Sequence, residues 1–383
     1  MPVPILRFKE FNDEWKVTLL SDLMSFNNGI NAEKSSYGHG RKFINVLDIL
    51  NNNSIKYKDI IGSVAVSEKV EQTNKVEYGD LLFLRSSETR DDVGKSSVYL
   101  DEDNFALFGG FVIRGKKQAD YYPYFLKLNL ESPTVRNQIG SKSGGSTRFN
   151  VSQSILNSIE ISIPTKKEQE KIADFISRFD RKIQLQQKKI DLLKEQKKGF
   201  MQKIFSQELR FRDEDGQEFP EWVEKNLSSL IKVNSGRDYK HLGQGNIPVY
   251  GTGGYMLSVD QSLSEADSIG IGRKGTIDVP QILKAPFWTV DTLFYCTPTE
   301  SNNLQFVYTL FEMIKWKSFD ESTGVPSLSK KTIENIVIQL PNIQEQKKIG
   351  TFFESLNFRI DYQVQKLKEM NTQKQAFMQQ MFI

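Results

Sequence analysis

Residues 161–205 have the sequence ISIPTKKEQEKIADFISRFDRKIQLQQKKIDLLKEQKKGFMQKIF, and residues 338–382 have the sequence IQLPNIQEQKKIGTFFESLNFRIDYQVQKLKEMNTQKQAFMQQMF. The two segments align without a gap at an offset of 177 residues (338 minus 161), and 16 of the 45 aligned positions are identical. Such a repeat indicates that one structural unit occurs twice in this chain of 383 residues.

Each segment predicts a short strand, a proline and a long helix. Apolar residues alternate with others before Pro164 and Pro341, which is the period of a strand with one buried face. Beyond each proline, apolar residues recur at alternating spacings of four and three, the pattern of a coiled coil. A helix of about 40 residues is roughly 60 Å long at 1.5 Å per residue. We therefore expect two long antiparallel helices that pack against each other.

The residues expected at the contact between these helices, here called the seam, are matched in the two segments. In the first helix they are Ile172, Ile176, Phe179, Ile183, Gln186, Ile190, Leu193, Lys197, Phe200 and Ile204. In the second they are Ile349, Phe353, Leu356, Ile360, Gln363, Leu367, Met370, Lys374, Phe377 and Met381. A polar residue in a seam lowers stability but can fix the register. One hypothesis gives Gln186 and Gln363 that role; the other treats them as polar residues tolerated at hydrated positions.

A second repeat opens each globular part of the chain. Leu6-Arg7-Phe8 followed by Glu14-Trp15 recurs as Leu209-Arg210-Phe211 followed by Glu221-Trp222. We call these two segments the heads. The order along the chain is head, domain, helix, head, domain, helix. We expect four regions: a first domain at 1–160, a long helix at 161–208, a second domain at 209–337 and a second long helix at 338–383.

Between head and helix, each half predicts a mixed α/β domain, so the fold class is α+β with a pseudo-twofold internal repeat. Strands are expected at residues 81–84, 111–113, 268–271 and 289–295, where β-branched and aromatic residues are bounded by turn residues. Helices are expected at residues 122–130 and 304–314. The middle parts of the two domains share little further sequence identity, so the two halves have similar heads and helices but different domains between them.

Composition excludes several classes of protein. The longest apolar runs fall short of the ~20 residues that span a bilayer, and residues 1–11 lack a secretory pattern, so we expect a cytoplasmic protein without membrane contact. A single cysteine, Cys296, and two histidines provide neither an internal disulfide nor a recognisable zinc site. The net charge is only +3, and the basic part of the chain is the first helix segment, residues 161–205, with 12 basic and 6 acidic residues. If the domains bind nucleic acid, they would therefore have to hold it through local basic loops and not through a general positive field.

Motifs of catalysis or cofactor binding are weak. Residues 270–275 fit GxGxxG, but a β-branched run and a proline follow where a dinucleotide-binding helix would begin. Residues 89–96 resemble a phosphate-binding loop without its first glycine. The chain also has no Pro-Pro pair of the kind found in amino-methyltransferase motifs. We expect no catalysis, no bound cofactor and no metal in this chain.

Loops that combine cations with small polar residues are suited to DNA, because cations bind phosphates while arginine and polar side chains can contact base edges. In the first domain the candidates are Ser36, Tyr37, Arg41, Lys42, Arg85, Ser86, Arg90, Lys142, Ser143, Thr147 and Arg148. In the second domain they are Arg237, Tyr239, Lys240, Thr252, Tyr255, Arg273, Lys274, Ser322 and Thr323. The Gly/Ser/Thr loop before the last strand occurs in both halves.

Each long helix begins with a similar segment: Pro164-Thr-Lys-Lys-Glu-Gln-Glu-Lys-Ile172 in the first and Pro341-Asn-Ile-Gln-Glu-Gln-Lys-Lys-Ile349 in the second. With these duplicated segments and this order of domains and helices, the chain resembles the specificity subunit of type I restriction-modification enzymes. The resemblance covers essentially the whole chain. It implies two target recognition domains that bind the halves of a split, asymmetric DNA site, and helices that act as a spacer. It also implies two methyltransferase subunits and restriction subunits as partners, with S-adenosylmethionine, ATP and magnesium on those partners.

Two other classes of function remain as alternatives. One is a self-sufficient DNA methyltransferase or nuclease, which methylation or cleavage by the isolated chain would reveal. The other is a coiled-coil adaptor that does not bind DNA, which the absence of salt-dependent DNA binding would favour.

Overall fold

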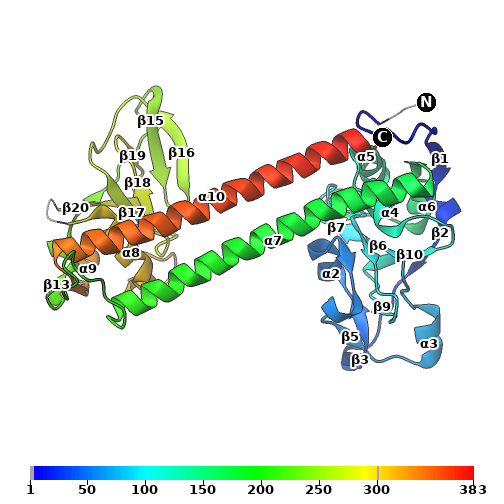
Figure 1. Ribbon diagram of the computed structural model, residues 1–383, viewed down its shortest axis with the longest axis horizontal. Helices are drawn as coiled ribbons and strands as arrows, with labels where there is room; N and C mark the ends of the chain where they lie inside the picture. Colours follow the sequence, from blue (N-terminus) through cyan, green and yellow to red (C-terminus); the bar gives the residue numbers. More distant parts are fainter. Residues whose placement is uncertain (1–3, 300–301) are drawn as a thin grey trace. The chain divides into compact units, whose positions relative to one another are not determined.

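The computed structural model describes residues 4–299 and 302–383. The chain divides into two compact units, one formed by the residues up to 185 together with 367–383 and the other by residues 186–366. Each unit contains one mixed α/β domain and a part of both long helices (Figure 1). In these described residues, no helix has the length and apolar character needed to cross a membrane.

The first domain is built on a five-stranded sheet in the order β2-β10-β6-β8-β4. These strands are β2 (Met24–Asn28), β10 (Val112–Lys117), β6 (Leu81–Leu84), β8 (Ser96–Tyr99) and β4 (Ser54–Ile55). All residues of β6 are buried because both faces of this strand are covered: Phe83 joins the core that contains Phe125, whereas Leu82 joins a second core with Ile49. A strand buried on both faces has a continuous apolar sequence.

Smaller elements complete the first domain. A three-stranded sheet contains β5 (Ser63–Val64), β3 (Tyr37–Ile44) and β9 (Leu107–Phe108). The helices are α1 (Leu20–Leu23), α2 (Val46–Asn51), α3 (Glu68–Thr73), α4 (Pro123–Asn129), α5 (Pro133–Lys142) and α6 (Gln153–Asn157). A two-stranded ladder joins β7 (Ser86–Ser87) to β11 (Phe149–Asn150).

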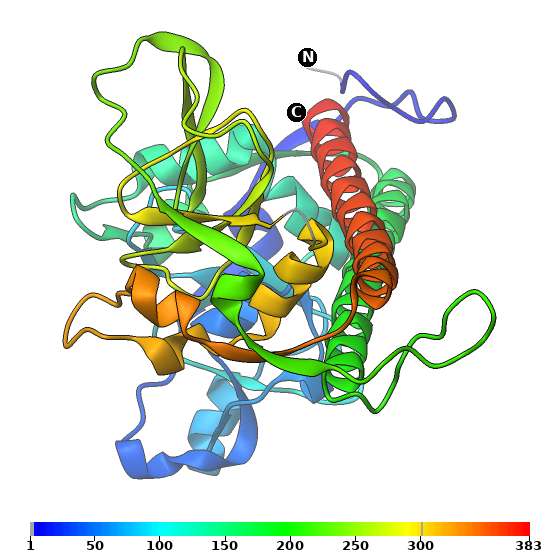
Figure 2. The ribbon, with the colours of Figure 1, turned by 90° about the vertical axis from the view of Figure 1, so that its left-hand side faces the viewer.

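The second domain has the same arrangement of central strands as the first. Its main sheet has the order β14-β20-β17-β18, and a smaller sheet has the order β16-β15-β19. These strands are β14 (Ile231–Ser235), β20 (Leu293–Pro298), β17 (Ser268–Gly272), β18 (Gln281–Leu283), β16 (Gly254–Val259), β15 (Gln244–Gly251) and β19 (Trp288–Thr289). Helices α8 (Leu304–Met313) and α9 (Lys330–Glu334) pack beside the main sheet. Figure 2 shows the β15–β16 hairpin extending from this domain.

A pair of antiparallel strands closes each domain next to its head. Strand β1 (Lys16–Leu19) pairs with β12 (Glu160–Ile163), and β13 (Val223–Asn226) pairs with β21 (Val337–Leu340). The register is also repeated, since Thr18 lies opposite Ile161 and Lys225 lies opposite Ile338. We call the head, this strand pair and the following long helix the frame of each half.

The two long helices are α7 (Lys166–Phe205) and α10 (Ile343–Met381). They are antiparallel: the rings of Phe175 and Phe377 are 5.1 Å apart in the first unit, and those of Phe200 and Phe352 are 5.2 Å apart in the second. The predicted seam residues are buried or half-buried apart from Phe200, which is 36% exposed. Its neighbour Met201 is 6% exposed and takes the buried place at this end of α7.

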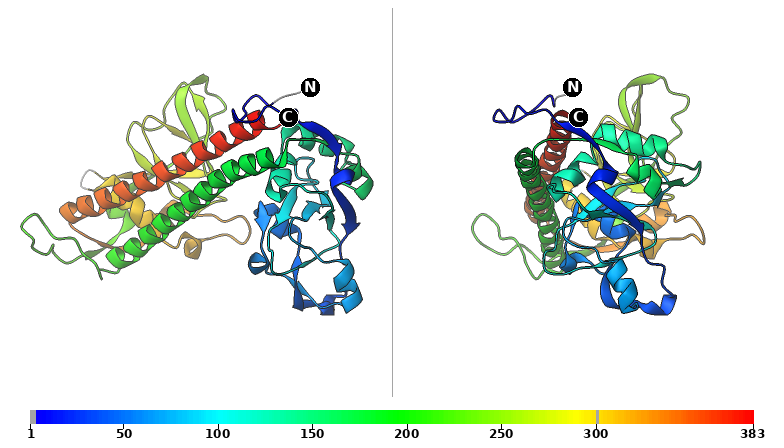
Figure 3. Two further views of the ribbon diagram at one scale, coloured as in Figure 1. Left: turned by 45° about the vertical axis from the view of Figure 1, so that its right-hand side comes forward. Right: turned by 90° about the vertical axis from the view of Figure 1, so that its right-hand side faces the viewer.

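The head of each frame is joined in the same way to the end of the other frame's long helix. In the first unit the amide of Leu6 donates to the carbonyl of Gln380, and in the second the amide of Leu209 donates to the carbonyl of Lys203. Figure 3 shows the N-terminal segment beside the end of α10 in the first unit. Leu6 corresponds to Leu209 in the head repeat, and Lys203 corresponds to Gln380 in the helix repeat.

Most of the predicted elements occur where the sequence pattern placed them. Strands β6 and β17 and helices α4 and α8 match the predictions, and β10 begins one residue later than predicted and ends at Lys117. The single strand predicted at 289–295 is wrong. The chain leaves β19, which pairs with β15, and enters β20, which pairs with β14 and β17, so this segment crosses from one sheet to the other.

Candidate nucleic-acid interface

Two candidate loops of the first domain meet at the end of strand β6. Strand β7 follows β6 directly, and its residues Ser86 and Ser87 pair with Asn150 and Phe149 of β11. The guanidinium of Arg90 lies 5.0 Å from the centre of the Phe149 ring. The loop that contains Arg85, Ser86 and Arg90 is therefore brought next to the loop that contains Thr147 and Arg148, although about 60 residues separate them in the sequence.

The equivalent loops of the second domain meet in the same manner. Lys274 forms a β-bridge with Ser327, and the amide of Gly275 donates to the carbonyl of Pro326 at 2.8 Å. This pairing places Arg273 and Lys274 next to the loop of residues 320–325. In that loop Thr323 is exposed, whereas Ser322 is half-buried and donates through its amide and hydroxyl to Asp320.

A separate group of candidates lies on the β15–β16 hairpin of the second domain. Tyr239, Lys240 and Tyr255 border a hollow of about 680 Å³, and the same three residues with Thr252 border an adjoining hollow of about 510 Å³. The Tyr255 side chain is 61% exposed. Arg237 is exposed nearby, and its carbonyl accepts a hydrogen bond from the Trp288 indole at 2.9 Å. An exposed aromatic ring beside cations and small residues suits a nucleic-acid backbone and its bases.

The candidates on strand β3 already have partners inside the first domain. Arg41 forms an ion pair with Glu71 at 3.5 Å and lies 4.1 Å from the centre of the Phe105 ring. The Lys42 ammonium donates to the carbonyl of Ile60, and the Tyr37 hydroxyl accepts from the amide of Ala32. Ser36 is half-buried in the short helix before β3. The contacts of Tyr37, Arg41 and Lys42 therefore stabilise the small sheet of the first domain.

Of the two candidates at the end of α5, Lys142 is exposed and Ser143 is buried. Ser143 is 8% exposed, and its hydroxyl donates to the carbonyl of Ile139, which satisfies the C-terminal turn of the helix. The Lys142 ammonium donates to the carbonyl and hydroxyl of Ser158. Thr147 and Arg148, farther along the same loop, are exposed. Ser143 therefore has a structural role, because a buried hydroxyl cannot contact a ligand at the surface.

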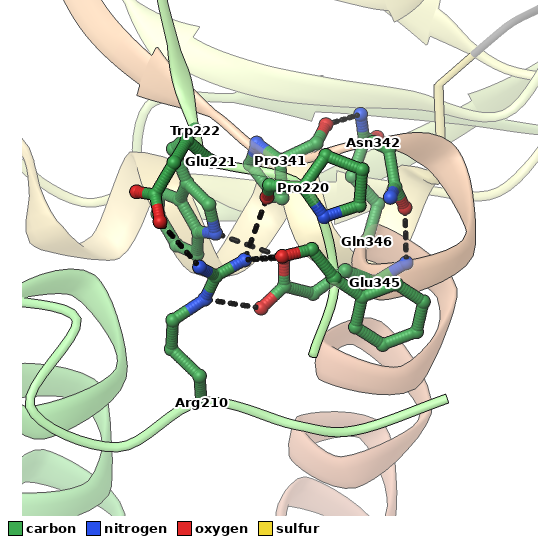
Figure 4. Close-up of polar contacts among 9 residues, drawn as sticks. Arg210, Pro220, Glu221, Trp222, Pro341, Asn342, Glu345 and Gln346 are labelled. Atoms are coloured by element: carbon green, nitrogen blue, oxygen red, sulfur yellow. Dashed lines mark hydrogen bonds and ion pairs between the residues drawn. The ribbon is translucent and has the colours of Figure 1, made fainter. Parts of the chain in front are cut away.

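A buried ion pair joins each head to the start of its long helix, and Figure 4 shows the pair of the second frame. In the second frame Arg210 donates to both oxygens of Glu345 at 3.2 and 2.9 Å, and the Trp222 indole donates to the same carboxylate at 2.9 Å. The Glu345 side chain is completely buried, and the hydrogen bonds that Arg210 donates to this carboxylate raise the pKa of Arg210. A buried carboxylate is tolerated when it is paired and hydrogen-bonded in this way.

The first frame contains the same ion pair. Arg7 donates to both oxygens of Glu168 at 2.7 Å, and the Trp15 indole lies 3.4 Å from Glu168 Oε1. The sequence contains both repeats, but the contact between the head and the helix was not predicted from it. The signal for this contact is that an arginine and a tryptophan recur in each head together with a glutamate in each helix.

The glutamine that follows this glutamate joins the helix to its own domain. Gln169 accepts from the amide of Tyr122 at 3.0 Å and donates to the carbonyl of Pro164 at 2.9 Å. Gln346 accepts from the amide of Asn303 at 3.2 Å and donates to the carbonyl of Pro341 at 3.0 Å. The repeated Pro-x-x-x-Glu-Gln motif is therefore explained by structure, since Glu holds the head and Gln holds the entry to α4 or α8.

The polar seam residues are all paired. Nε2 of Gln186 donates to Oε1 and to the main-chain oxygen of Gln363, both at 2.9 Å. Lys197 donates to Glu312 of α8 at 2.6 Å, and Lys374 donates to Asp180 of α7 at 2.5 Å. Burial raises the pKa of Tyr308, which lies beside Glu312, to about 12. The seam cations therefore have carboxylate partners at positions shielded from water.

The two weak motifs lie in strands and turns, and a strand rather than a helix follows each of them in the chain. Residues 270–275 run through β17 into a turn rather than into a helix, and Lys95 of the loop 89–96 forms an ion pair with Asp92. Cys296 is buried, and this burial raises the pKa of its thiol. Within residues 4–299 and 302–383, no cluster of three or more His, Cys, Asp or Glu side chains is arranged to hold a metal ion.

Comparisons with known proteins agree on one family. The family model described as the type I restriction modification DNA specificity domain matches residues 12–195 and 220–372. The putative type I restriction enzyme MjaX specificity subunit of Methanocaldococcus jannaschii is 23% identical and aligns with 96% of this chain and 93% of its own length. The MjaVIII specificity subunit of the same organism is 24% identical over 69% of this chain and 70% of its own length.

Solved structures share the fold. The S subunit of a type I restriction-modification system from M. genitalium superposes with a TM-score of 0.64 at 18% identity and covers 100% of this chain and 99% of its own. A chain from a study of complex assembly in the type I R-M system has a TM-score of 0.57 at 12% identity, with 96% and 97% covered.

Proposed function

Because this chain belongs to the type I restriction-modification DNA specificity family, we propose that its two target recognition domains each bind one half of a split, asymmetric DNA site. The chain is a non-catalytic subunit of a restriction enzyme complex. The two alternatives, a self-sufficient enzyme and an adaptor without DNA binding, are therefore wrong. The division of the DNA site between the domains is our proposal.

The observation that carries this proposal is the contrast between the frames and the domains. Both frames have the same strand register and the same buried Arg–Glu pair. The smaller sheets differ: β3 pairs with a two-residue strand, whereas β15 forms a long hairpin with β16. Two similar frames that carry different loops suit a DNA site with two different halves.

We place the DNA contacts on the exposed loops at the sheet ends and on the β15–β16 hairpin. Arg85, Arg90 and Arg148 are exposed in the first domain, and Arg273, Lys274 and Tyr255 are exposed in the second. Phosphate contacts position a protein on DNA, whereas contacts to base edges give sequence specificity. Each domain has exposed side chains that can donate to phosphates and side chains that can donate to base edges.

We place the methyltransferase contacts on the outer faces of the long helices. In the second unit Leu192 is 58%, Phe358 73% and Tyr362 59% exposed, although all three belong to helices with a buried seam. Exposed apolar side chains that lie together mark interaction surfaces, and Phe358 and Tyr362 are about one helical turn apart on α10. Two methyltransferase subunits would carry S-adenosylmethionine, and the restriction subunits would carry ATP and magnesium. The target adenine has to leave the DNA stack for methylation, so this chain need only hold the methyltransferase over the correct base.

The test is to sequence methylated positions in DNA from cells that carry this chain with its methyltransferase partner. We expect a bipartite motif with two different halves and a fixed gap. Cells with the partner alone are the control and should lack this motif. A continuous motif, a symmetric motif or methylation without this chain would contradict the proposal.

A further inference from the structure

An arginine occupies the same position at the end of the central strand in both domains. Leu84 of β6 lies opposite Val112, and Gly272 of β17 lies opposite Leu293. Each arginine is the next residue, and its amide donates to the turn before the partner strand: Arg85 to Phe111 at 3.0 Å and Arg273 to Thr292 at 2.8 Å. The ladders thus make Arg85 and Arg273 structural equivalents, which their different sequence surroundings hide.

A second backbone hydrogen bond fixes each arginine from the other side. The carbonyl of Arg85 accepts from the amide of Val151 at 2.9 Å, and the carbonyl of Arg273 accepts from the amide of Leu328 at 3.0 Å. Residues 151 and 328 are 177 positions apart, which is the offset of the long helices. The main chain at both arginines therefore belongs to the repeated part of the molecule.

The side chains of both arginines are open to solvent while the strands before them are buried. Arg85 Nη1 donates to the carbonyl of Gly110 at 3.2 Å, and the Arg273 guanidinium lies 5.8 Å from the centre of the Phe294 ring. Neither guanidinium has a carboxylate within ion-pair distance in the part of the chain that the structure describes. Two exposed cations thus lack an internal counter-ion.

A polar hollow adjoins Arg85. Its volume is about 430 Å³, and Asn28, Asn150, Ser152 and Ser154 line it without any acidic side chain. In the second domain the residue equivalent to Ser152 is Ser329, whose hydroxyl donates to Glu321 at 3.0 Å. A carboxylate therefore reduces the positive potential there, and the exposed neighbour Lys274 adds a second cation beside Arg273.

From these contacts we propose that Arg85 and Arg273 are equivalent phosphate contacts, one in each target recognition domain, which hold the DNA backbone and do not select bases. The inference rests on the proposed DNA-binding function. The two domains differ in the loops that would contact bases, whereas the phosphodiester backbone is the same chemical group in any sequence. A cation that keeps its place while the surrounding loops differ suits that constant group.

The test measures DNA affinity of the complete complex of this chain with its methyltransferase partner. The probes are a duplex with the methylated motif and a duplex with that motif scrambled, titrated between roughly 50 and 200 mM salt. We expect Arg85→Ala and Arg273→Ala each to weaken binding to both duplexes by about tenfold, the effect of one charge-assisted hydrogen bond. Each variant should lower the slope of log K against log salt by about 1 and leave the methylated motif unchanged.

Two further variants make the result decisive. Arg85→Lys should restore most of the binding, because lysine still contacts a phosphate but loses the bidentate pairing with guanine. Arg212→Ala is the control, since Arg212 is 67% exposed and lies in the second head, away from the loops. Loss of binding confined to the motif duplex, an altered motif, no rescue by lysine, or behaviour equal to Arg212→Ala would overturn the inference. If the unsubstituted complex does not distinguish the two duplexes, the proposed function itself fails.

Discussion

Gln186 and Gln363 occupy the same place in the two copies of the helix repeat, and they are hydrogen-bonded to each other at 2.9 Å. Near this contact, α7 and α10 therefore face each other through equivalent residues of the repeat. Each glutamine lies 20 residues after the start of its helix (186 minus 166 and 363 minus 343).

The glutamine pair predicts that a more stable, fully apolar seam would have a less well-defined register. Replacing both residues with leucine should raise the urea midpoint, because an apolar seam is more stable, and should allow shifted or intermolecular helix pairing. Light scattering would detect the oligomers. Gln187→Leu is the control, because Gln187 is exposed and its side chain donates to Asp191 of its own helix. A double variant that stays monomeric and has one register would show that the glutamines are merely tolerated.

The buried ion pair of the second frame predicts a large difference between two carboxylates that contact one arginine. Glu345→Gln should lower the free energy of unfolding by about 3 kcal/mol, because the change breaks a pair whose carboxylate is completely buried. Glu221 lies 3.7 Å from the same Arg210 but is 91% exposed. Glu221→Gln should change stability by less than about 0.5 kcal/mol. Urea unfolding measures both, and equal effects would contradict this account of the frame.

The pair between Lys197 and Glu312 predicts a rescue. Lys197→Met should destabilise the second unit by about 1–3 kcal/mol, because it leaves the half-buried Glu312 carboxylate without its cation. Adding Glu312→Leu should restore most of the loss, since apolar residues often replace a buried pair at little cost. A double-mutant cycle by thermal unfolding measures this coupling. Additive effects of the two substitutions would mean that the pair contributes nothing to the attachment of α7 to α8.

The division into frames and domains predicts modular specificity. Residues 30–150 lie between β2 and the end of β11, so replacing them with the corresponding residues of another family member keeps the first frame. One half of the methylated motif should change, while the other half and the gap stay the same. Methylome sequencing of cells with the chimaera provides the measurement. A change in both halves would exclude independent domains.

The long helices, the heads and the seam could be predicted from the sequence because their patterns are local and occur twice. The split between β19 and β20 could not, since residues 288–298 are rich in β-branched and aromatic residues throughout and only the available partner strands decide where the chain changes sheets. The pairing of Arg7 with Glu168 could not be derived from spacing, because 161 residues separate them. The grouping of the loops at β7 and β11 likewise depends on strand register, which the loop sequences do not contain.

The two closures of the frame have a consequence for the origin of the molecule. Leu209 and Lys203 are six positions apart in the chain (209 minus 203), yet Leu6 and Gln380 make the same hydrogen bond across 374 positions (380 minus 6). A half-length ancestor that paired with a second copy of itself would make both contacts identically. Duplication and fusion of such an ancestor would need only to link the copies, after which mutations in one domain could accumulate without altering the other.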